Sequence, residues 1–87
     1  MDAAQFQLPV RLVMRAGESV TEIYSAEEAL DLLLRWPVQE GPIFERALST
    51  CLAAAADPAE RDEAHEAFVV FARVTGLLAR DVPLDSL

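Results

Sequence analysis

Three helix-start signals follow one another after residue 24, and they restrict the fold more than any other feature of the chain. Ser25 stands three residues before Glu28, which is the spacing of a capping box, and Gly41-Pro42 places proline at a first helical position. The third signal, Asp57-Pro58-Ala59-Glu60, joins a capping aspartate to a proline and a glutamate. Most of the chain is therefore predicted to form short helices with breaks between them.

The ends of these helices are also marked. Pro37 disfavours helical geometry at Trp36, so the first helix is expected to stop there. The second helix continues through the four alanines 53–56, and the third runs from about 58 to 75, with Gly76 as its break. Apolar residues at helical spacing predict one buried face on each helix. The expected faces are Ala29, Leu32 or Leu33, and Trp36; Ile43, Ala47, Cys51 and Ala55; and Ala64, Ala67, Phe68, Phe71, Val74 and Leu78.

The segment before these helices reads as an antiparallel hairpin, with strands at 8–15 and 18–24 around Ala16-Gly17. Pairing Arg15 with Glu18 places Arg11 opposite Glu22 and Val10 opposite Ile23. Opposite charges then share one face, as expected for a sheet with one solvated side. The same register pairs Met14 with Ser19, Val13 with Val20, and Leu12 with Thr21.

The chain length allows one domain, 1–87, with an ordered core at about 6–80 and a frayed tail at 83–87. We predict an α+β fold in the order β-β-α-α-α, in which the hairpin packs against three helices. Residues 77–82 fit either a last helical turn or a third short strand.

Charge narrows the classes of partner. The 15 acidic and 7 basic residues give a net charge of −8, and the basic residues are scattered singly. Direct nucleic-acid binding and binding to an anionic membrane are therefore disfavoured. The acidic excess either serves solubility or forms an acidic face for a basic partner. One cysteine and a start without a basic or apolar leader pattern favour the cytoplasm.

Three ordered segments resemble a known family: YSAEEALDLLLRWP, GPIFERALSTCLAAA and AHEAFVVFARVTG. Together they resemble a small bacterial family, known mainly from rhizobia and their relatives, that is catalogued as domain of unknown function number 982. The resemblance covers roughly residues 6–82, and His65 departs from it because arginine is usual there. It supports the predicted fold and supplies no catalytic residue. The residues that carry it are Glu28, Ala29, Leu33, Trp36, Pro37, Gly41, Ala47, Cys51, Ala64, Ala67, Phe68, Ala72 and Gly76.

The residues offer little catalytic chemistry. Cys51 and His65 are the only thiol and imidazole, and a Cys–His nucleophile pair is one reading of them. We favour a buried, inert Cys51 in the apolar stripe and a solvated His65 among Asp62, Glu63 and Glu66. The sequence therefore predicts no catalytic residue, no cofactor and no metal site.

The remaining apolar residues suggest an interaction surface. Phe68–Ala72 is a continuous apolar run that spans more than one helix face, and Leu32–Leu34 does the same. The candidate surface residues are Val69, Val70, Leu34 and Trp36, although Trp36 also fits a core position over the hairpin. We expect a non-enzymatic protein-interaction or regulatory domain with an unknown protein partner, or a homodimer. The alternative is a small-ligand-binding protein or an enzyme whose pocket the sequence does not reveal.

Overall fold

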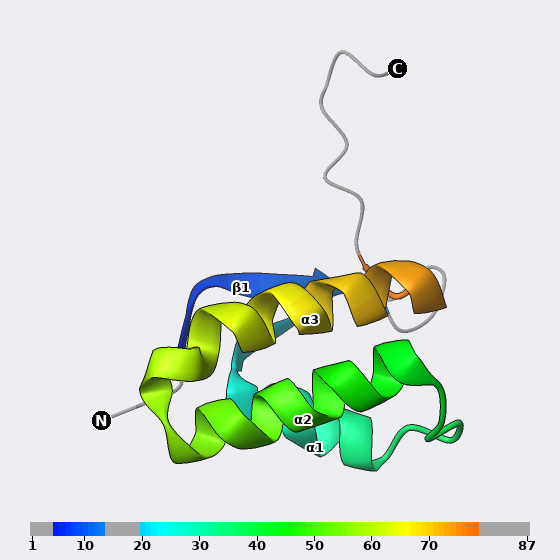
Figure 1. The fold of residues 1–87 in the computed structure, drawn as a ribbon. Helices are drawn as coiled ribbons and strands as arrows, with labels where there is room; N and C mark the ends of the chain where they lie inside the picture. The colour runs from blue at the N-terminus through cyan, green and yellow to red at the C-terminus, as the bar shows by residue number, and fades with distance from the viewer. Residues whose placement is uncertain (1–4, 14–19, 79–87) are drawn as a thin grey trace.

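Two strands come first in the chain and three helices follow, as predicted (Figure 1). The computed structural model describes residues 5–13 and 20–78. Its elements are β1 (Gln5–Leu12), β2 (Thr21–Ser25), α1 (Ala26–Leu34), α2 (Pro42–Ala56), a 3-10 turn η1 (Pro58–Glu60) and α3 (Arg61–Thr75). The α+β class and the order β-β-α-α-α are confirmed. Within the described ranges no helix is both long enough and apolar enough to cross a membrane.

The hairpin has the register that charge alternation predicted. Val10 pairs with Ile23, Arg11 with Glu22 and Leu12 with Thr21, all antiparallel. The guanidinium Nε of Arg11 lies 3.7 Å from a carboxylate oxygen of Glu22 on the solvated face. The predicted pairs Met14–Ser19 and Arg15–Glu18 and the turn at Ala16-Gly17 lie outside the described residues.

Strand β1 begins earlier than predicted, at Gln5 rather than residue 8. The register shifts between Gln5 and Val10, where Pro9 has no N–H to donate to a ladder. The early start brings Phe6 into the core, because Phe6 lies before the predicted start of the strand but has the same alternation as the buried Val10 and Leu12.

The helix termini follow the predicted signals. The Ser25 hydroxyl accepts a hydrogen bond from the Glu28 N–H at 3.1 Å, and the Asp57 carboxylate accepts one from the Ala59 N–H at 3.1 Å. The second cap serves a 3-10 turn, so the segment predicted as helix from 58 becomes α-helical only at Arg61. Gly76 adopts a left-handed conformation, and the N–H of Leu77 donates to the Ala72 carbonyl at 2.8 Å, as in a Schellman motif.

The buried face of α2 is centred on Ala47 and Cys51, as predicted, but the prediction for its two ends is wrong. Phe44 and Ala54 are buried, whereas Ile43 and Ala55 are exposed. A strict four-residue spacing drifts by about 40° per step around an α-helix, so its ends leave the buried face. Alternating steps of three and four stay on that face.

The buried face of α3 also differs from the prediction at one end. Phe68 and Phe71 are buried as expected, but Val74 is 61% exposed and Ala72 is buried instead. Because α3 contacts α2 on one flank and β1 on the other, its buried face is wider than a single stripe. The contacts with α2 and β1 therefore bury most of the apolar run at 68–72.

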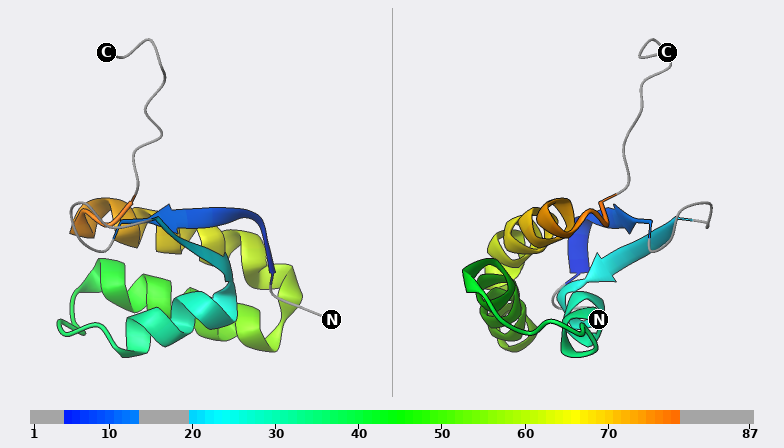
Figure 2. Two further views of the ribbon diagram at one scale, coloured as in Figure 1. Left: turned by 180° about the vertical axis from the view of Figure 1, so that it is seen from behind. Right: turned by 90° about the vertical axis from the view of Figure 1, so that its right-hand side faces the viewer.

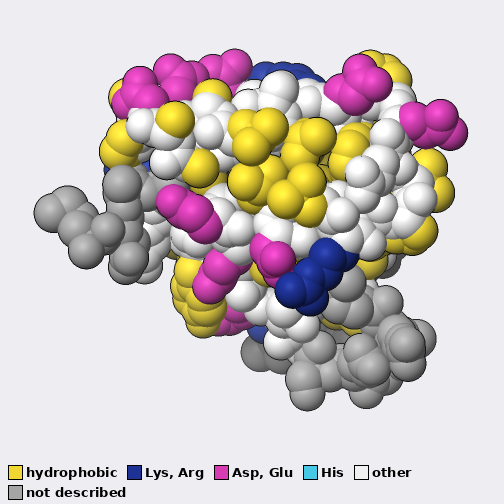
Figure 3. Space-filling model, turned by 90° about the horizontal axis from the view of Figure 1, so that it is seen from below, with side chains coloured by type: hydrophobic (Ala, Val, Ile, Leu, Met, Phe, Trp, Pro, Cys, Tyr) yellow, Lys and Arg dark blue, Asp and Glu magenta, His cyan; other side chains and the backbone are white. Residues whose placement is uncertain are grey.

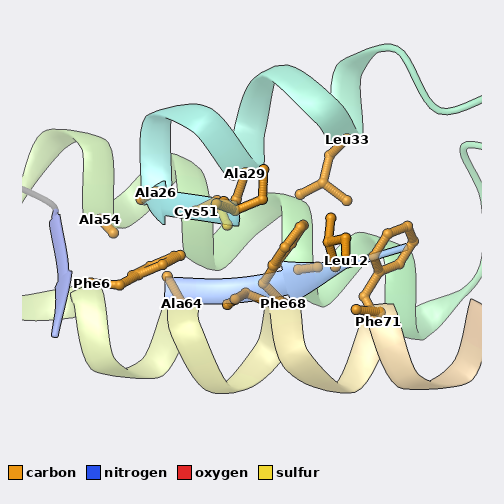
Figure 4. Packing of buried hydrophobic residues seen from close by; sticks show 14 of the residues in the cluster. Phe6, Leu12, Ala26, Ala29, Leu33, Cys51, Ala54, Ala64, Phe68 and Phe71 are labelled. Atoms are coloured by element: carbon orange, nitrogen blue, oxygen red, sulfur yellow. The ribbon is translucent and has the colours of Figure 1, made fainter. Parts of the chain in front are cut away.

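The core lies between the hairpin and the three helices, which surround it when seen end-on (Figure 2, right). Phe68 is fully buried and points from α3 toward the side of the core formed by Leu33 and Cys51 (Figure 4). Phe6 enters the opposite end of the core, where Ala54 and Ala64 leave room for its ring. Helices α2 and α3 pack antiparallel, and an exposed ion pair of 3.8 Å joins Arg46 on α2 to Glu63 on α3.

The open question at residues 77–82 is answered only for its first two positions. Leu78 forms an isolated antiparallel bridge with Leu12, and the Val13 N–H donates to the Leu77 carbonyl at 2.7 Å. These residues therefore pair with β1 in an extended conformation. Residues 79–82 and the tail at 83–87 lie outside the described residues.

Candidate functional site

An open groove of about 830 Å³ runs between β2 and the first helix, and we call it the β2–α1 groove. Its lining comes from one strand, one helix and the residues that follow the helix. Strand β2 contributes Thr21, Glu22, Ile23 and Tyr24, and the helical side contributes Glu27, Glu28, Asp31, Leu32, Arg35, Trp36 and Pro37.

The capping residues of α1 create this groove. Strand β2 ends at Ser25 and α1 begins at the next residue, so the two elements diverge from one point. The Ser25 hydroxyl holds the Glu28 N–H, and the Glu28 carboxylate in return accepts the Tyr24 N–H at 2.7 Å. This reciprocal pair resembles a capping box displaced by one residue. The two hydrogen bonds join β2 to α1 at the end of the groove where the two elements meet.

The rim of the groove is acidic. Four carboxylates and one guanidinium line it, and the guanidinium of Arg35 lies 3.3 Å from the carboxylate of Asp31, one turn earlier in the chain. The Tyr24 hydroxyl donates a hydrogen bond to Glu22. The nearby Glu22 carboxylate raises the pKa of Tyr24, because it binds the protonated hydroxyl and repels the phenolate.

The deeper lining is apolar. Ile23 is buried, and Leu32 and Trp36 are partly buried against the core. The indole ring of Trp36 meets Phe71 edge-on, with ring centroids 5.4 Å apart. This aromatic contact holds Trp36 at the end of the groove, where one part of its ring contacts the core and another part is exposed.

Trp36 also lines a second groove of about 440 Å³, between the start of α2 and the end of α3. Its lining is mostly apolar and includes Ile43, Phe44, Phe71 and Val74. Trp36 therefore belongs to both grooves. The predicted core role is confirmed only in part, because its side chain is half-buried.

The structure separates the four candidate surface residues. Leu34 on α1 is 57% exposed, whereas Val69 packs against the core and Val70 is half-buried on α3. Of the four, Trp36 alone lines the two grooves. Sequence reasoning missed the groove because it interpreted Glu28 only as part of a capping box and did not relate the acidic residues of this helix to the strand before it. A signal was present, since four carboxylates occur between residues 22 and 31 around the apolar Ile23.

Cys51 and His65 lie outside both grooves. Cys51 is fully buried as predicted, and this burial raises the pKa of its thiol to about 12. His65 is half-buried rather than solvated, because its ring packs edge-on against Phe6 with centroids 5.0 Å apart. Among the described residues, no three His, Cys, Asp or Glu side chains gather in a way that could hold a metal ion.

Comparison with known families gives one match. The model of the family described as protein of unknown function (DUF982) matches residues 8–79. The chain belongs to this family. The resemblance that the sequence motifs indicated is thereby confirmed. No curated protein and no solved structure matched the chain.

The DUF982 motif residues quoted above divide by structural role. Most are buried, including Leu33, Cys51 and Phe68, and Gly41 and Gly76 have positive φ at helix ends. Trp36 and Pro37 are neither buried nor caps, and they line the β2–α1 groove.

Proposed function

We propose that this DUF982 protein is a non-enzymatic interaction module that binds a partner polypeptide in the β2–α1 groove. The observation that carries the proposal is the groove itself, which combines apolar side chains, an acidic rim and a strand edge. Apolar surface provides the free energy of binding, whereas charge and backbone groups provide specificity.

The positions of the reactive side chains support a non-enzymatic role. The thiol of Cys51 is fully buried, and a thiol with a pKa of about 12 is almost entirely protonated at neutral pH. The imidazole of His65 packs on Phe6, outside the groove. Neither group is therefore placed to act on a molecule bound between β2 and α1.

A displayed library of random peptides, selected on the immobilised protein, tests this function. Leu32→Gln removes apolar lining with little change in volume, and Leu8→Gln is its control because Leu8 is an exposed leucine on β1 outside the groove. We expect selected peptides to lose binding to the Leu32 variant and to keep it with the Leu8 variant. Equal binding to both variants would exclude the groove as the interaction site.

The second groove favours a second candidate function, the binding of a small apolar molecule beside Trp36. Its lining by Ile43, Phe44 and Val74 suits an alkyl or aromatic group. Addition of decanol should then shift the NMR methyl resonances of Ile43 and Val74. Unchanged resonances would exclude this function.

We also propose that two copies associate through an apolar face formed by α1 and α2. Leu34 and Leu52 are 57% and 51% exposed, and Leu30 and Leu48, one turn before each, are partly buried. Figure 3 shows apolar side chains gathered in the middle of the face that α1 and α2 form, with mostly acidic and some basic side chains around them. Two-fold pairing is the commonest way in which such a face is covered.

A further inference from the structure

We propose that the β2–α1 groove binds a basic segment of polypeptide in extended conformation, which adds to β2 as a further strand. This inference rests on the proposed interaction function, and it specifies the partner's chemistry and the mode of binding. Strand addition of this kind takes its affinity from main-chain hydrogen bonds and its specificity from alternate side chains.

One edge of β2 is open in the part of the chain that the structure describes. Its partner strand is β1, and no second partner pairs with it within residues 5–13 and 20–78. The other edge of the sheet is covered near Leu12 by the bridge to Leu78. In the end-on view, β2 forms the outer margin of the sheet above α1 (Figure 2, right).

Backbone groups on this edge point toward the groove. The Tyr24 N–H donates to Glu28, a groove residue on α1, and so it points away from β1. Because backbone groups of successive strand residues alternate between the two edges, the N–H and carbonyl of Glu22 project from the same edge. The Tyr24 N–H is already bonded, which leaves Glu22 and the Tyr24 carbonyl for an added strand.

The side chains beside that edge alternate between the two faces of the sheet. Ile23 belongs to the buried face of the sheet and Glu22 to the solvated face, where it meets Arg11. Residues of an added strand would alternate in the same way. Those beside Ile23 would face Leu32 and Trp36 and should be apolar, whereas those beside Glu22 should be basic.

The groove carries four carboxylates against one guanidinium, and the whole chain carries a net charge of −8. This field repels an acidic segment, including one from a second copy of the chain, and attracts a basic one. A short segment in which arginine or lysine alternates with apolar residues therefore fits the groove best.

A capped hexapeptide of alternating arginine and valine is the probe, and the fluorescence of the single tryptophan, Trp36, is the signal. We expect saturable binding that weakens as salt is added, and no binding of the matching glutamate–valine peptide. Glu22→Gln should weaken binding about fivefold, as for one partly exposed charge pair. Glu66→Gln removes the same charge from an exposed position of α3 outside the groove and should leave the affinity unchanged.

Methylation of the peptide's amide nitrogens tests backbone pairing directly. Alternate N–H groups of a strand face one edge, so one peptide is methylated at its arginines and another at its valines. We expect one of the two to lose binding, the arginine form if the added strand is antiparallel and the valine form if it is parallel. Retained binding by both would overturn strand addition.

These results separate the inference from the function on which it rests. If library peptides bind in a Leu32-dependent manner but the arginine–valine peptide does not bind, the basic extended partner is wrong and the interaction function stands. If the arginine–valine peptide binds equally well to Leu32→Gln, it contacts acidic surface elsewhere, and the inference is wrong. If neither the library peptides nor the arginine–valine peptide bind, the interaction function and the inference are both wrong.

Discussion

The side chains in the middle of the core are apolar. Phe68 stacks near Phe71, with centroids 6.0 Å apart, and Cys51 occupies a fully buried position on the facing helix. None of the described residues that are buried is polar or charged. Stability at this scale therefore depends on volume and desolvation rather than on buried hydrogen bonds.

The Cys51 thiol should make stability depend on pH in the alkaline range. Its pKa is about 12 in the folded chain and 9.0 ordinarily, so between those values the unfolded chain releases the proton that the folded chain keeps. Stability should be unaffected by this group below pH 9 and fall by about 1.4 kcal/mol per pH unit above it. Urea titrations of the wild type and Cys51→Ala from pH 7 to 11 check this. Parallel curves for the two proteins would contradict the prediction.

Phe68→Ala should cost about 3–5 kcal/mol of unfolding free energy, because the ring is fully buried and its loss leaves a cavity. A domain of this size has roughly 5–10 kcal/mol in total, so the variant should be marginally folded at physiological temperature. Thermal melting by circular dichroism measures the loss. Val74→Ala, on the exposed side of the same helix, is the control and should melt like the wild type.

At the scale of elements, the residues at the helix ends determine where each helix begins and how it joins its neighbour. Glu28 is the clearest case, because its N–H is capped by Ser25 while its carboxylate binds the Tyr24 N–H. The same residues that begin α1 therefore also join it to β2. A change in this cap should affect both the helix and the geometry of the groove.

Ser25→Ala should destabilise the protein by about 1 kcal/mol, the usual cost of losing an N-terminal cap. The Glu28 N–H would lose its side-chain acceptor, and the start of α1 would fray. Chemical denaturation gives the free energy, and hydrogen exchange at residues 27–29 should accelerate more than exchange in α3. Ser49→Ala is the control, since Ser49 is exposed, lies in the middle of α2 and caps no helix terminus.

The whole molecule combines an apolar face over α1 and α2 with a large negative charge. The two oppose each other in self-association, since contact of the apolar faces brings acidic rims together. Salt screens the rims far more than it affects apolar contact, because the Debye length is about 10 Å at 0.1 M. Added salt should therefore strengthen self-association, whereas it should weaken the binding of a basic segment in the β2–α1 groove.

Self-association should tighten with salt and require the apolar face. Analytical ultracentrifugation at tens of micromolar should show a dimer whose fraction rises between low and high salt. Leu34→Glu should abolish it, because a charge on the exposed flank of α1 is repelled by its symmetry mate. Val74→Glu adds the same charge at an exposed position of α3 and should not. A 9.5 kDa species at every salt concentration would contradict the dimer.

Local interactions account for what the sequence predicted well. Caps at Ser25 and Asp57, the left-handed end at Gly76 and the pairing of Arg11 with Glu22 each depend on residues close in the chain or across one hairpin. Such contacts can be deduced from spacing and charge without knowledge of the rest of the molecule. The family motifs added the order of the segments, which the match over residues 8–79 confirmed.

The tertiary structure alone decided which flank of each helix is covered. Ala72 is buried and Val74 is exposed because α3 contacts α2 on one flank and β1 on the other, which the spacing of apolar residues along α3 does not reveal. The same packing sets Trp36 against Phe71 at the meeting point of two grooves. In the part of the chain that the structure describes, it also leaves one edge of β2 without a partner strand beside four carboxylates. The sequence by itself therefore determined the elements and their register. The grooves arise from how elements distant in the chain are placed against one another, which depends on the sum of many weak contacts.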